Sequence, residues 1–249
     1  MLLRLLSSIF ALALLTPFAA AQEREGDYLY RVSTMRAAPG RLEELLNWFA
    51  AVKDSDFYKE AGESAPFLMR HSQGDQWDLL LITPMGSMQA FYKDNRIKKR
   101  DRAAGIIPTV AADPSDLIAF SEDMFANGPS LEVIKAAYES NTLFHIEMFH
   151  AAPGKYSELV QQRRMENAYL AATGQTQNMI FVNHTGSDVD VFTIGFHKSL
   201  QAFAEPSPAT AEESESAAIA AGFKDRADIS FYLRSLISSH HDTLAVKVE

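Results

Sequence analysis

Two stretches of the chain decide its fold: LYRVSTMRAAPG at residues 29–40 and LFHIEMFHAAPG at residues 143–154. In both, side chains alternate with a period of two, as in a strand, and then reach Pro-Gly, which commonly opens a helix. The two stretches are 114 positions apart, and Gln89-Ala90-Phe91 recurs 112 positions later as Gln201-Ala202-Phe203. One register, with a shift of two residues, thus relates the two halves and predicts an internal duplication.

The first copy predicts a strand, a helix, a hairpin, a second helix and a last strand. Apolar residues from Leu42 to Val52 recur at helical spacing, and Gly62 is expected to end that helix. Gly74 permits the tight turn of the hairpin. The predicted ranges are 27–37 (strand), 39–62 (helix), 67–71 and 77–83 (hairpin), 87–104 (helix) and 117–125 (strand).

The second copy predicts the same order, β-α-β-β-α-β. Its second helix is interrupted at Pro206-Ser207-Pro208, because proline removes a backbone donor and clashes with the preceding turn. The predicted ranges are 142–151 (strand), 153–174 (helix), 178–184 and 189–197 (hairpin), an interrupted helix ending at 222, and 229–239 (strand). Asn127-Gly128-Pro129 separates the copies, and residues 131–139 are expected to form a short connecting helix.

Composition excludes several classes of function. The chain of 249 residues is 47% hydrophobic and 22% charged, which is typical of a globular protein. Its formal charge of −9 gives no general attraction to phosphate backbones, so no nucleic-acid partner is expected. The chain has no cysteine, which excludes disulfides, thiolate nucleophiles and cysteine-ligated metals.

Residues 1–21 have the pattern of a secretory signal peptide. Arg4 precedes an apolar run, and Ala19, Ala20 and Ala21 end it, so we expect cleavage between Ala21 and Gln22. An uncleaved anchor is the alternative, but the run is shorter than the ~20 residues that span a bilayer. We therefore expect a periplasmic or secreted protein with no stable membrane anchor after cleavage.

The repeated unit resembles the dimeric α/β-barrel superfamily of ferredoxin-like domains, which includes antibiotic-biosynthesis-type monooxygenases, chlorite-dismutase-like proteins and the NIPSNAP family. The resemblance rests on a strand, Ala-Pro-Gly and a helix carrying Glu-Leu, and it covers nearly the whole mature chain twice. It implies an α+β fold in which two antiparallel sheets enclose a pocket. The predicted units are a first repeat at 22–127, a linker helix at 128–140 and a second repeat at 141–249. The barrel would form within one chain or by pairing across a homodimer.

The alternation of strand side chains predicts which residues face that pocket. We expect the apolar sets to meet the helices: Tyr30, Val32 and Thr34 in the first copy and Phe144, Ile146 and Met148 in the second. The opposite sets are then expected to face the barrel interior: Arg31, Ser33 and Met35 against His145, Glu147 and Phe149.

His145 and Glu147 are the candidate catalytic residues, because a carboxylate can orient an imidazole and raise its basicity. Such a pair suits a general base that takes a proton from an acidic phenol or enol. The structural alternative is that both residues pair with Arg31 or Arg234 in a polar interface between the sheets. Arg31 and Ser33, with Tyr232 and Arg234 on the last strand, are the candidate ligand-binding residues.

No metal or haem is expected. His184 or His197 could join His145 and Glu147 around a metal, but no local spacing signature supports this. The haem-degrading relatives place an Asn, a Trp and a His in set positions that this sequence does not match, so none of those residues is carried over.

Two charged segments on the helices are expected to be structural. Residues 93–102 contain six basic and two acidic residues and predict a solvated helix face. Arg163 and Arg164 interrupt the apolar stripe of the second copy, which we attribute to a shifted helix register rather than to an arginine turned inward.

The sequence thus predicts an exported protein that binds a small apolar or aromatic molecule between its two sheets. The enzymatic version is a cofactor-independent, monooxygenase-like reaction with His145 as base. The alternative is a non-catalytic structural or interaction protein, and a barrel interior filled by large side chains would favour it.

Overall fold

The structure is a computed structural model that describes residues 26–107 and 114–248. The predicted signal peptide lies outside these residues. In the first half the elements are β1 (Tyr28–Ala37), α1 (Leu42–Asp54), α2 (Phe57–Ala61), β2 (Phe67–Gln73), β3 (Leu79–Gly86), α3 (Met88–Phe91), α4 (Asp94–Ala104), a 3₁₀ turn (Pro114–Leu117) and β4 (Ile118–Gly128).

Helix α5 (Leu131–Ser140) connects the halves, as expected for residues 131–139. The second half contains β5 (Leu143–Ala151), α6 (Tyr156–Ala172), β6 (Asn178–Thr185), β7 (Val191–His197), α7 (Leu200–Ala204), α8 (Ala211–Ala221), α9 (Asp228–Leu236) and β8 (Ile237–Lys247). Among the described residues, no helix is both long and apolar enough to cross a membrane.

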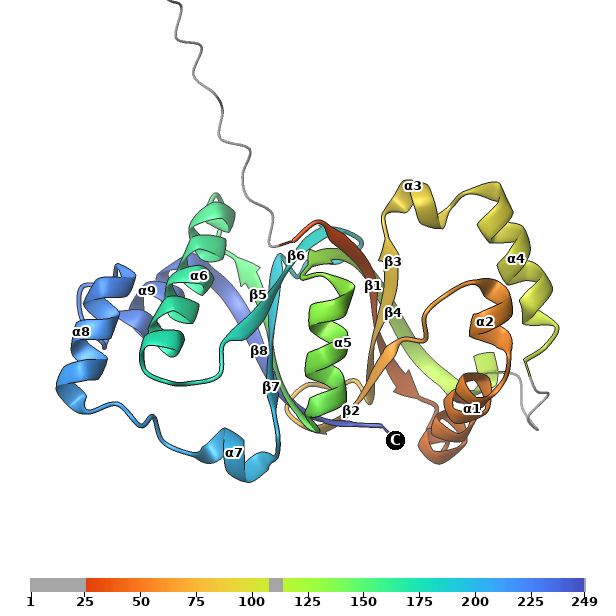
Figure 1. Cartoon of the computed structure of the whole chain (residues 1–249), viewed down its shortest axis with the longest axis horizontal. Coiled ribbons are helices and arrows are strands. Elements are labelled where there is room, and N and C mark those ends of the chain that lie inside the picture. Colours follow the sequence, from red (N-terminus) through yellow and green to blue (C-terminus); the bar gives the residue numbers. More distant parts are fainter. Residues whose placement is uncertain (1–25, 108–113, 249) are drawn as a thin grey trace, which may run out of the picture.

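All eight strands form one closed antiparallel barrel in the order β1-β3-β2-β8-β5-β7-β6-β4. The first half contributes β4-β1-β3-β2 and the second β8-β5-β7-β6, joined by β2 with β8 and by β4 with β6. The barrel therefore closes within one chain. Helices α1 to α4 cover one side of it and α6, α8 and α9 the other (Figure 1).

Local hydrogen bonds recur at corresponding places of the two halves. The Asp78 carboxylate accepts from the Ala37 backbone N–H at 2.8 Å, and the Asp190 carboxylate accepts from Ala151 N–H at 2.7 Å. Each aspartate thereby fixes the end of the first strand of its half. The two bonds occupy equivalent places in the strand orders β4-β1-β3-β2 and β8-β5-β7-β6. The origin of the halves as ferredoxin-like repeats stays a prediction.

Two hairpin glycines lie where the halves join. A Cβ at Gly74 would lie 2.1 Å from the Asp242 carbonyl oxygen of β8, and one at Gly186 would lie 2.8 Å from the Asp123 carbonyl oxygen of β4. Both residues also have positive φ, of 119° and 103°. Glycine is therefore required at both seams for the strands to approach closely enough to close the barrel.

The prediction for residues 229–239 is wrong. Residues 228–236 form α9, and the last strand, β8, begins only at Ile237. Apolar residues at 229, 232, 233 and 236 fit a helical stripe that packs on α6 and the second sheet. Tyr232 and Arg234 therefore lie on a helix rather than on a barrel strand.

Candidate functional site

The barrel interior is filled rather than hollow. One buried cluster takes apolar side chains from all eight strands, including Tyr30, Val32, Phe144, Ile146 and Phe181. Stacked and edge-on rings occupy its centre, with Phe181 and Phe192 centroids 4.5 Å apart. Helix α5 packs Ile134 against the same cluster. Within the described part of the chain, the interior therefore leaves only a void of about 30 Å³, too small for a ligand larger than water.

The predicted assignment of strand faces is thus inverted. The apolar sets, which we expected to meet the helices, point into the barrel. Arg31, Ser33 and Met35, like His145, Glu147 and Phe149, lie on the outer face beneath helices. A closed barrel has two covered faces, and the inner one, which all eight strands enclose, carries the stricter demand for apolar side chains. The candidate residues consequently fall into two separate cavities, one on each side of the barrel.

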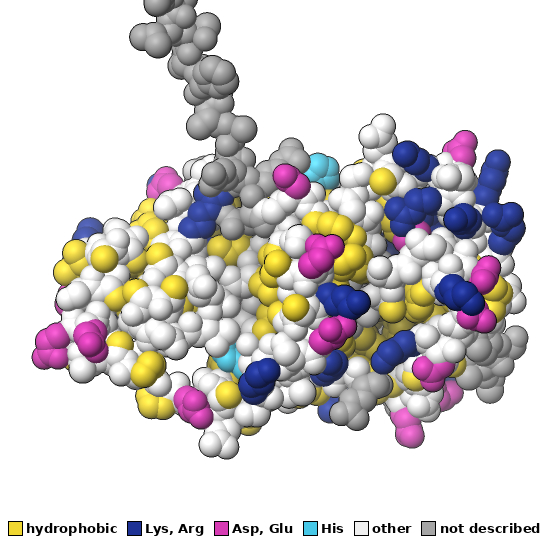
Figure 2. Space-filling model, in the orientation of Figure 1, with side chains coloured by type: hydrophobic (Ala, Val, Ile, Leu, Met, Phe, Trp, Pro, Cys, Tyr) yellow, Lys and Arg dark blue, Asp and Glu magenta, His cyan; other side chains and the backbone are white. Residues whose placement is uncertain are grey.

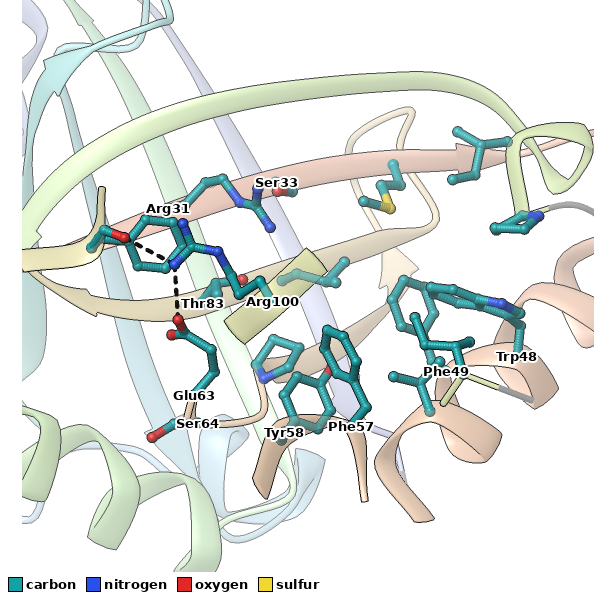
Figure 3. Close-up of a pocket in the computed structure, with 18 residues that line it drawn as sticks. Arg31, Ser33, Trp48, Phe49, Phe57, Tyr58, Glu63, Ser64, Thr83 and Arg100 are labelled. Carbon is teal, nitrogen blue, oxygen red and sulfur yellow. Dashed lines mark hydrogen bonds and ion pairs between the residues drawn. The ribbon is translucent and has the colours of Figure 1, made fainter. Parts of the chain in front are cut away.

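The first is an aromatic cavity of about 290 Å³ between the first sheet and helices α1, α2 and α4. Its walls are mostly apolar or aromatic: Met35, Trp48, Phe49, Val52, Phe57, Tyr58, Pro66, Leu81, Phe91, Ile107, Pro114 and Ile118, with Arg31, Ser33, Glu63, Ser64, Thr83 and Arg100 as polar members. Figure 3 shows Trp48 and Phe49 at one end of this cavity and the polar group at the other.

Arg31 and Arg100 mark the polar end of the aromatic cavity (Figure 3). Arg100 is held in place: it pairs with Glu63 at 2.9 Å, donates to the Phe91 carbonyl at 2.9 Å, and lies 4.0 Å from the centroid of the Phe91 ring. Arg96 also pairs with Glu63, so two guanidinium groups share one carboxylate. The polar end therefore has an excess of positive charge.

Arg31 differs from Arg100 because its Nε is buried and has no hydrogen-bond partner among residues 26–107 and 114–248. Its positive charge also opposes the rise that burial imposes on the pKa of Tyr58 across the cavity. A buried donor without a partner is uncommon and costs free energy. Ser33 lines the same cavity, but its hydroxyl donates to the Asp123 carboxylate.

The second cavity, here called the polar cavity, has a volume of about 610 Å³ and lies between β5, β7, α6 and the segment around α7. Its walls include His145, Glu147, Glu166, His197 and Phe203. His145 and Glu147 are thus brought together as predicted, although outside the barrel. Their catalytic role stays a prediction.

Charged groups gather at the floor of the polar cavity. His145 Nε2 lies 3.6 Å from Asp242 Oδ1. Burial lowers the pKa of the imidazole, but the close Asp242 carboxylate and the charges of Glu147 and Glu166 outweigh burial and raise it. The contact with His145 lowers the pKa of the Asp242 carboxyl. Burial lowers the pKa of His197, and the charge of His145 lowers it further.

Arg163 is turned inward, contrary to the expected shift of helix register. Its side chain is buried, lies 3.6 Å from Glu147 and pairs closely with Glu166. It also lies over the Phe149 ring at 4.7 Å. Burial raises the pKa of Glu166, and the Arg163 charge opposes that rise. Arg163 therefore holds both carboxylates from the helix side.

Tyr232 and Arg234 line neither cavity. Tyr232 packs between α6 and α8, near Phe223. Arg234 Nη1 lies 3.1 Å from Nδ1 of His240, and Nε2 of the same ring lies 3.1 Å from Asp242 Oδ2. The expectation that these two residues meet Arg31 and Ser33 in one pocket is wrong, because α9 replaces the predicted strand.

Several site residues escaped the sequence analysis. Arg96 and Arg100 belong to the basic run predicted as a solvated face, yet both turn inward to Glu63. The remaining basic side chains do gather at the exposed α4 end (Figure 2). Arg100 lies over the Phe91 ring, but the two residues belong to different helices, so no spacing in the sequence indicates this contact. Asp242 gave no signal either, because its strand was not predicted.

Comparisons with known proteins support the fold. No protein family and no curated protein matches the chain. The solved structure of an anthrone oxidase-like protein matches with a TM-score of 0.53 and 11% identity over 90% of this chain and 93% of its own. A putative monooxygenase from Fusobacterium nucleatum matches with a TM-score of 0.52 and 11% identity over 90% and 94%. At these identities the likeness shows the fold alone: the chain shares its α+β barrel fold with these two structures.

Proposed function

We propose that this protein binds a small aromatic or otherwise apolar molecule carrying one anionic or carbonyl oxygen. The binding site is the aromatic cavity, with the oxygen directed at Arg31. The apolar body would lie between Trp48, Phe49 and Phe57, and the volume is near the lower end of the ~300–1,000 Å³ usual for small-molecule sites.

The observation that carries this proposal is the buried Nε of Arg31 at the end of an apolar cavity, for which the described part of the chain offers no hydrogen-bond partner. A ligand oxygen there would satisfy a donor that otherwise remains unpaired, and a charge-assisted bond of this kind is among the stronger hydrogen bonds. Arg100, fixed by Glu63, adds positive charge from the helix side.

The reaction class that we propose is oxidation of the bound molecule by dioxygen without a cofactor. A phenol or enol is more acidic beside Arg31, and its anion gives electrons to dioxygen; an activated methylene becomes a carbonyl with one oxygen atom, and the other leaves as water. The names of the two neighbours, anthrone oxidase-like protein and putative monooxygenase, support this class over the NIPSNAP-like alternative. Fold does not fix activity, so turnover must be measured.

The experiment compares binding and turnover in one preparation. Native mass spectrometry of the mature chain tests for a co-purified molecule, and an oxygen electrode with anthrone as probe tests for consumption of one dioxygen per anthrone. We expect the Arg31→Met variant to lose turnover. Turnover that is unchanged in this variant would contradict the proposal, as would a chain that binds no aromatic anion.

A non-catalytic structural or interaction protein is the second candidate. The filled barrel interior favours it, because the pocket first expected between the sheets is absent from the described part of the chain. Binding of an aromatic anion without oxygen consumption would indicate a binding protein without catalysis. No binding in either cavity would favour the structural or interaction protein.

We also propose export to the periplasm or medium, with cleavage after Ala21. We further propose that the two halves arose by duplication of one ferredoxin-like unit. The matched Asp78 and Asp190 bonds support the duplication. N-terminal sequencing of the exported protein tests the cleavage: Gln22 is the expected first residue. A homodimer remains a proposal that native mass spectrometry tests in the same experiment.

A further inference from the structure

We propose that His145, Glu147 and Asp242 form a divalent-metal site at the floor of the polar cavity, separate from the aromatic cavity. Within residues 26–107 and 114–248, these three are the one group of three or more metal-ligating side chains whose donor atoms converge. One imidazole nitrogen and two carboxylate oxygens all lie within 4.8 Å of one another. His145 Nε2 and Asp242 Oδ1 lie 3.6 Å apart, and the Asp242 side chain is half-exposed.

The pairing of strands creates the cluster. In the β5–β8 ladder, Glu147 lies directly opposite Asp242, and His145 lies two residues from Glu147 on the same face. Two carboxylates directly opposite each other on one face repel. Arg163 lies 3.6 Å from Glu147 on the helix side, and a cation between the two carboxylates would offset the repulsion that remains.

The charge of the surrounding groups has the sign that a divalent cation requires. Glu147, Asp242 and Glu166 are three carboxylates, and Arg163 is the guanidinium that contacts Glu147 and Glu166. When all are ionised, these four groups carry two negative charges in excess. One divalent ion balances that excess, with the imidazole of His145 as a neutral ligand.

Outer partners orient the carboxylates. Arg234 Nη1 donates to His240 Nδ1 at 3.1 Å, so the proton of this ring lies on Nε2, which donates to Asp242 Oδ2 at 3.1 Å. Oδ1 is then the oxygen directed at His145. On the other strand, Thr193 Oγ1 donates to Glu147 Oε2 at 3.0 Å. Such fixed second partners are typical of metal ligands.

The cavity leaves room for further ligands. Gly195 pairs with His145 across β5 and β7, and a Cβ at this position would lie 2.9 Å from His197 Nε2. The glycine therefore keeps the space beside His145 free of a side chain. With three protein ligands, the remaining positions would open into the polar cavity and take water or a small oxygen ligand. One nitrogen and two carboxylate oxygens suit Mn²⁺, Fe²⁺, Co²⁺ or Zn²⁺.

The test uses the mature chain without a histidine tag, stripped with EDTA and titrated with Co²⁺ alone. Binding is followed by visible absorption, and Mn²⁺ binding by electron paramagnetic resonance. We expect one ion per chain, loss of binding in Glu147→Gln and Asp242→Asn, and an affinity about 10- to 100-fold lower in His240→Ala. His150→Ala is the matched control: His150 forms a similar pair with Asp188 at 3.4 Å, outside the cluster, and its loss should leave binding unchanged.

The proposal is overturned if no ion binds at one per chain, or if Asp242→Asn binds as tightly as the parent chain. Circular dichroism of the metal-free proteins checks folding; if Glu147→Gln does not fold, the half-exposed Asp242 decides the question. Binding of an aromatic anion in the other cavity is measured on the same samples, so the two proposals fail independently.

Discussion

Replacing Arg31 with methionine should change stability and ligand affinity in opposite directions. Methionine keeps an unbranched apolar stem and removes the guanidinium. Leaving a buried donor unsatisfied costs about 1–3 kcal/mol, so its removal should leave the free energy of unfolding unchanged or raise it. A hydrogen bond to a charged group contributes about 1.5–3 kcal/mol, and about 1.4 kcal/mol is a tenfold change in Kd. The Kd for an aromatic anion should therefore rise about 10- to 100-fold.

The assay pairs two fluorescent probes that share one aromatic body. Anilinonaphthalene sulfonate carries an anion, whereas N-phenylnaphthylamine does not, so Arg31→Met should weaken the first strongly and the second little. Arg36→Met, at an exposed position on the same strand, is the control and should change neither. Urea unfolding gives the stability. A variant less stable by more than about 1 kcal/mol with unchanged affinity for the sulfonate would refute the argument, because Arg31 would then be structural.

Three further predictions concern the barrel. Phe144→Ala, which leaves a cavity in the filled interior, should lower the free energy of unfolding by about 3–5 kcal/mol in urea titrations. The control is Phe231→Ala, at a site 73% exposed, which should change the free energy of unfolding by less than about 0.5 kcal/mol. Burial raises the pKa of Tyr138, whose hydroxyl donates to the Leu68 carbonyl, to about 12, so absorbance at alkaline pH should show a component near 12 that Tyr138→Phe removes. Because the raised pKa favours the neutral folded form, this contribution to stability is lost as pH rises from 10 toward 12. Asp78→Ala and Asp190→Ala should each cost about 1–3 kcal/mol in thermal or urea unfolding, and clearly unequal costs would contradict equivalent roles in the two halves.

Local patterns predicted most elements because they depend on near neighbours. The stripe from Leu42 to Val52 forms α1, with Leu45 and Val52 buried, and Gly62 ends the helix that follows. Turn glycines located both hairpins. These signals rest on helix periodicity and backbone conformation, which short stretches of sequence specify.

The sequence could not show which covered face of the sheet is the interior. Period-two alternation groups Tyr30 with Val32 and Arg31 with Ser33, but both groups are covered in a barrel that has helices outside it. The apolar group belongs inside because residues from eight strands enclose it, and this depends on barrel closure rather than on the strand itself. The same ambiguity applied to His145 and Glu147.

The last strand was missed because its position is determined by its neighbours. Residues 237–242, Ile-Ser-Ser-His-His-Asp, have little β propensity, yet β8 pairs with β2 and β5 and completes the barrel. No signal in the sequence therefore indicated that Asp242 lies beside His145. Arg100 was missed for a related reason, since Glu63, its partner, lies 37 positions away.

The location of the proposed ligand site is tested most directly by the two tryptophan side chains of the chain. Trp48 lines the aromatic cavity, whereas Trp77 belongs to the barrel interior. In the ¹⁵N-labelled mature protein, the two indole N–H resonances are assigned with Trp48→Phe and followed during titration with anilinonaphthalene sulfonate. We predict that the Trp48 resonance shifts with saturation while that of Trp77 stays in place. A shift of Trp77 alone would place the ligand inside the barrel and contradict the account.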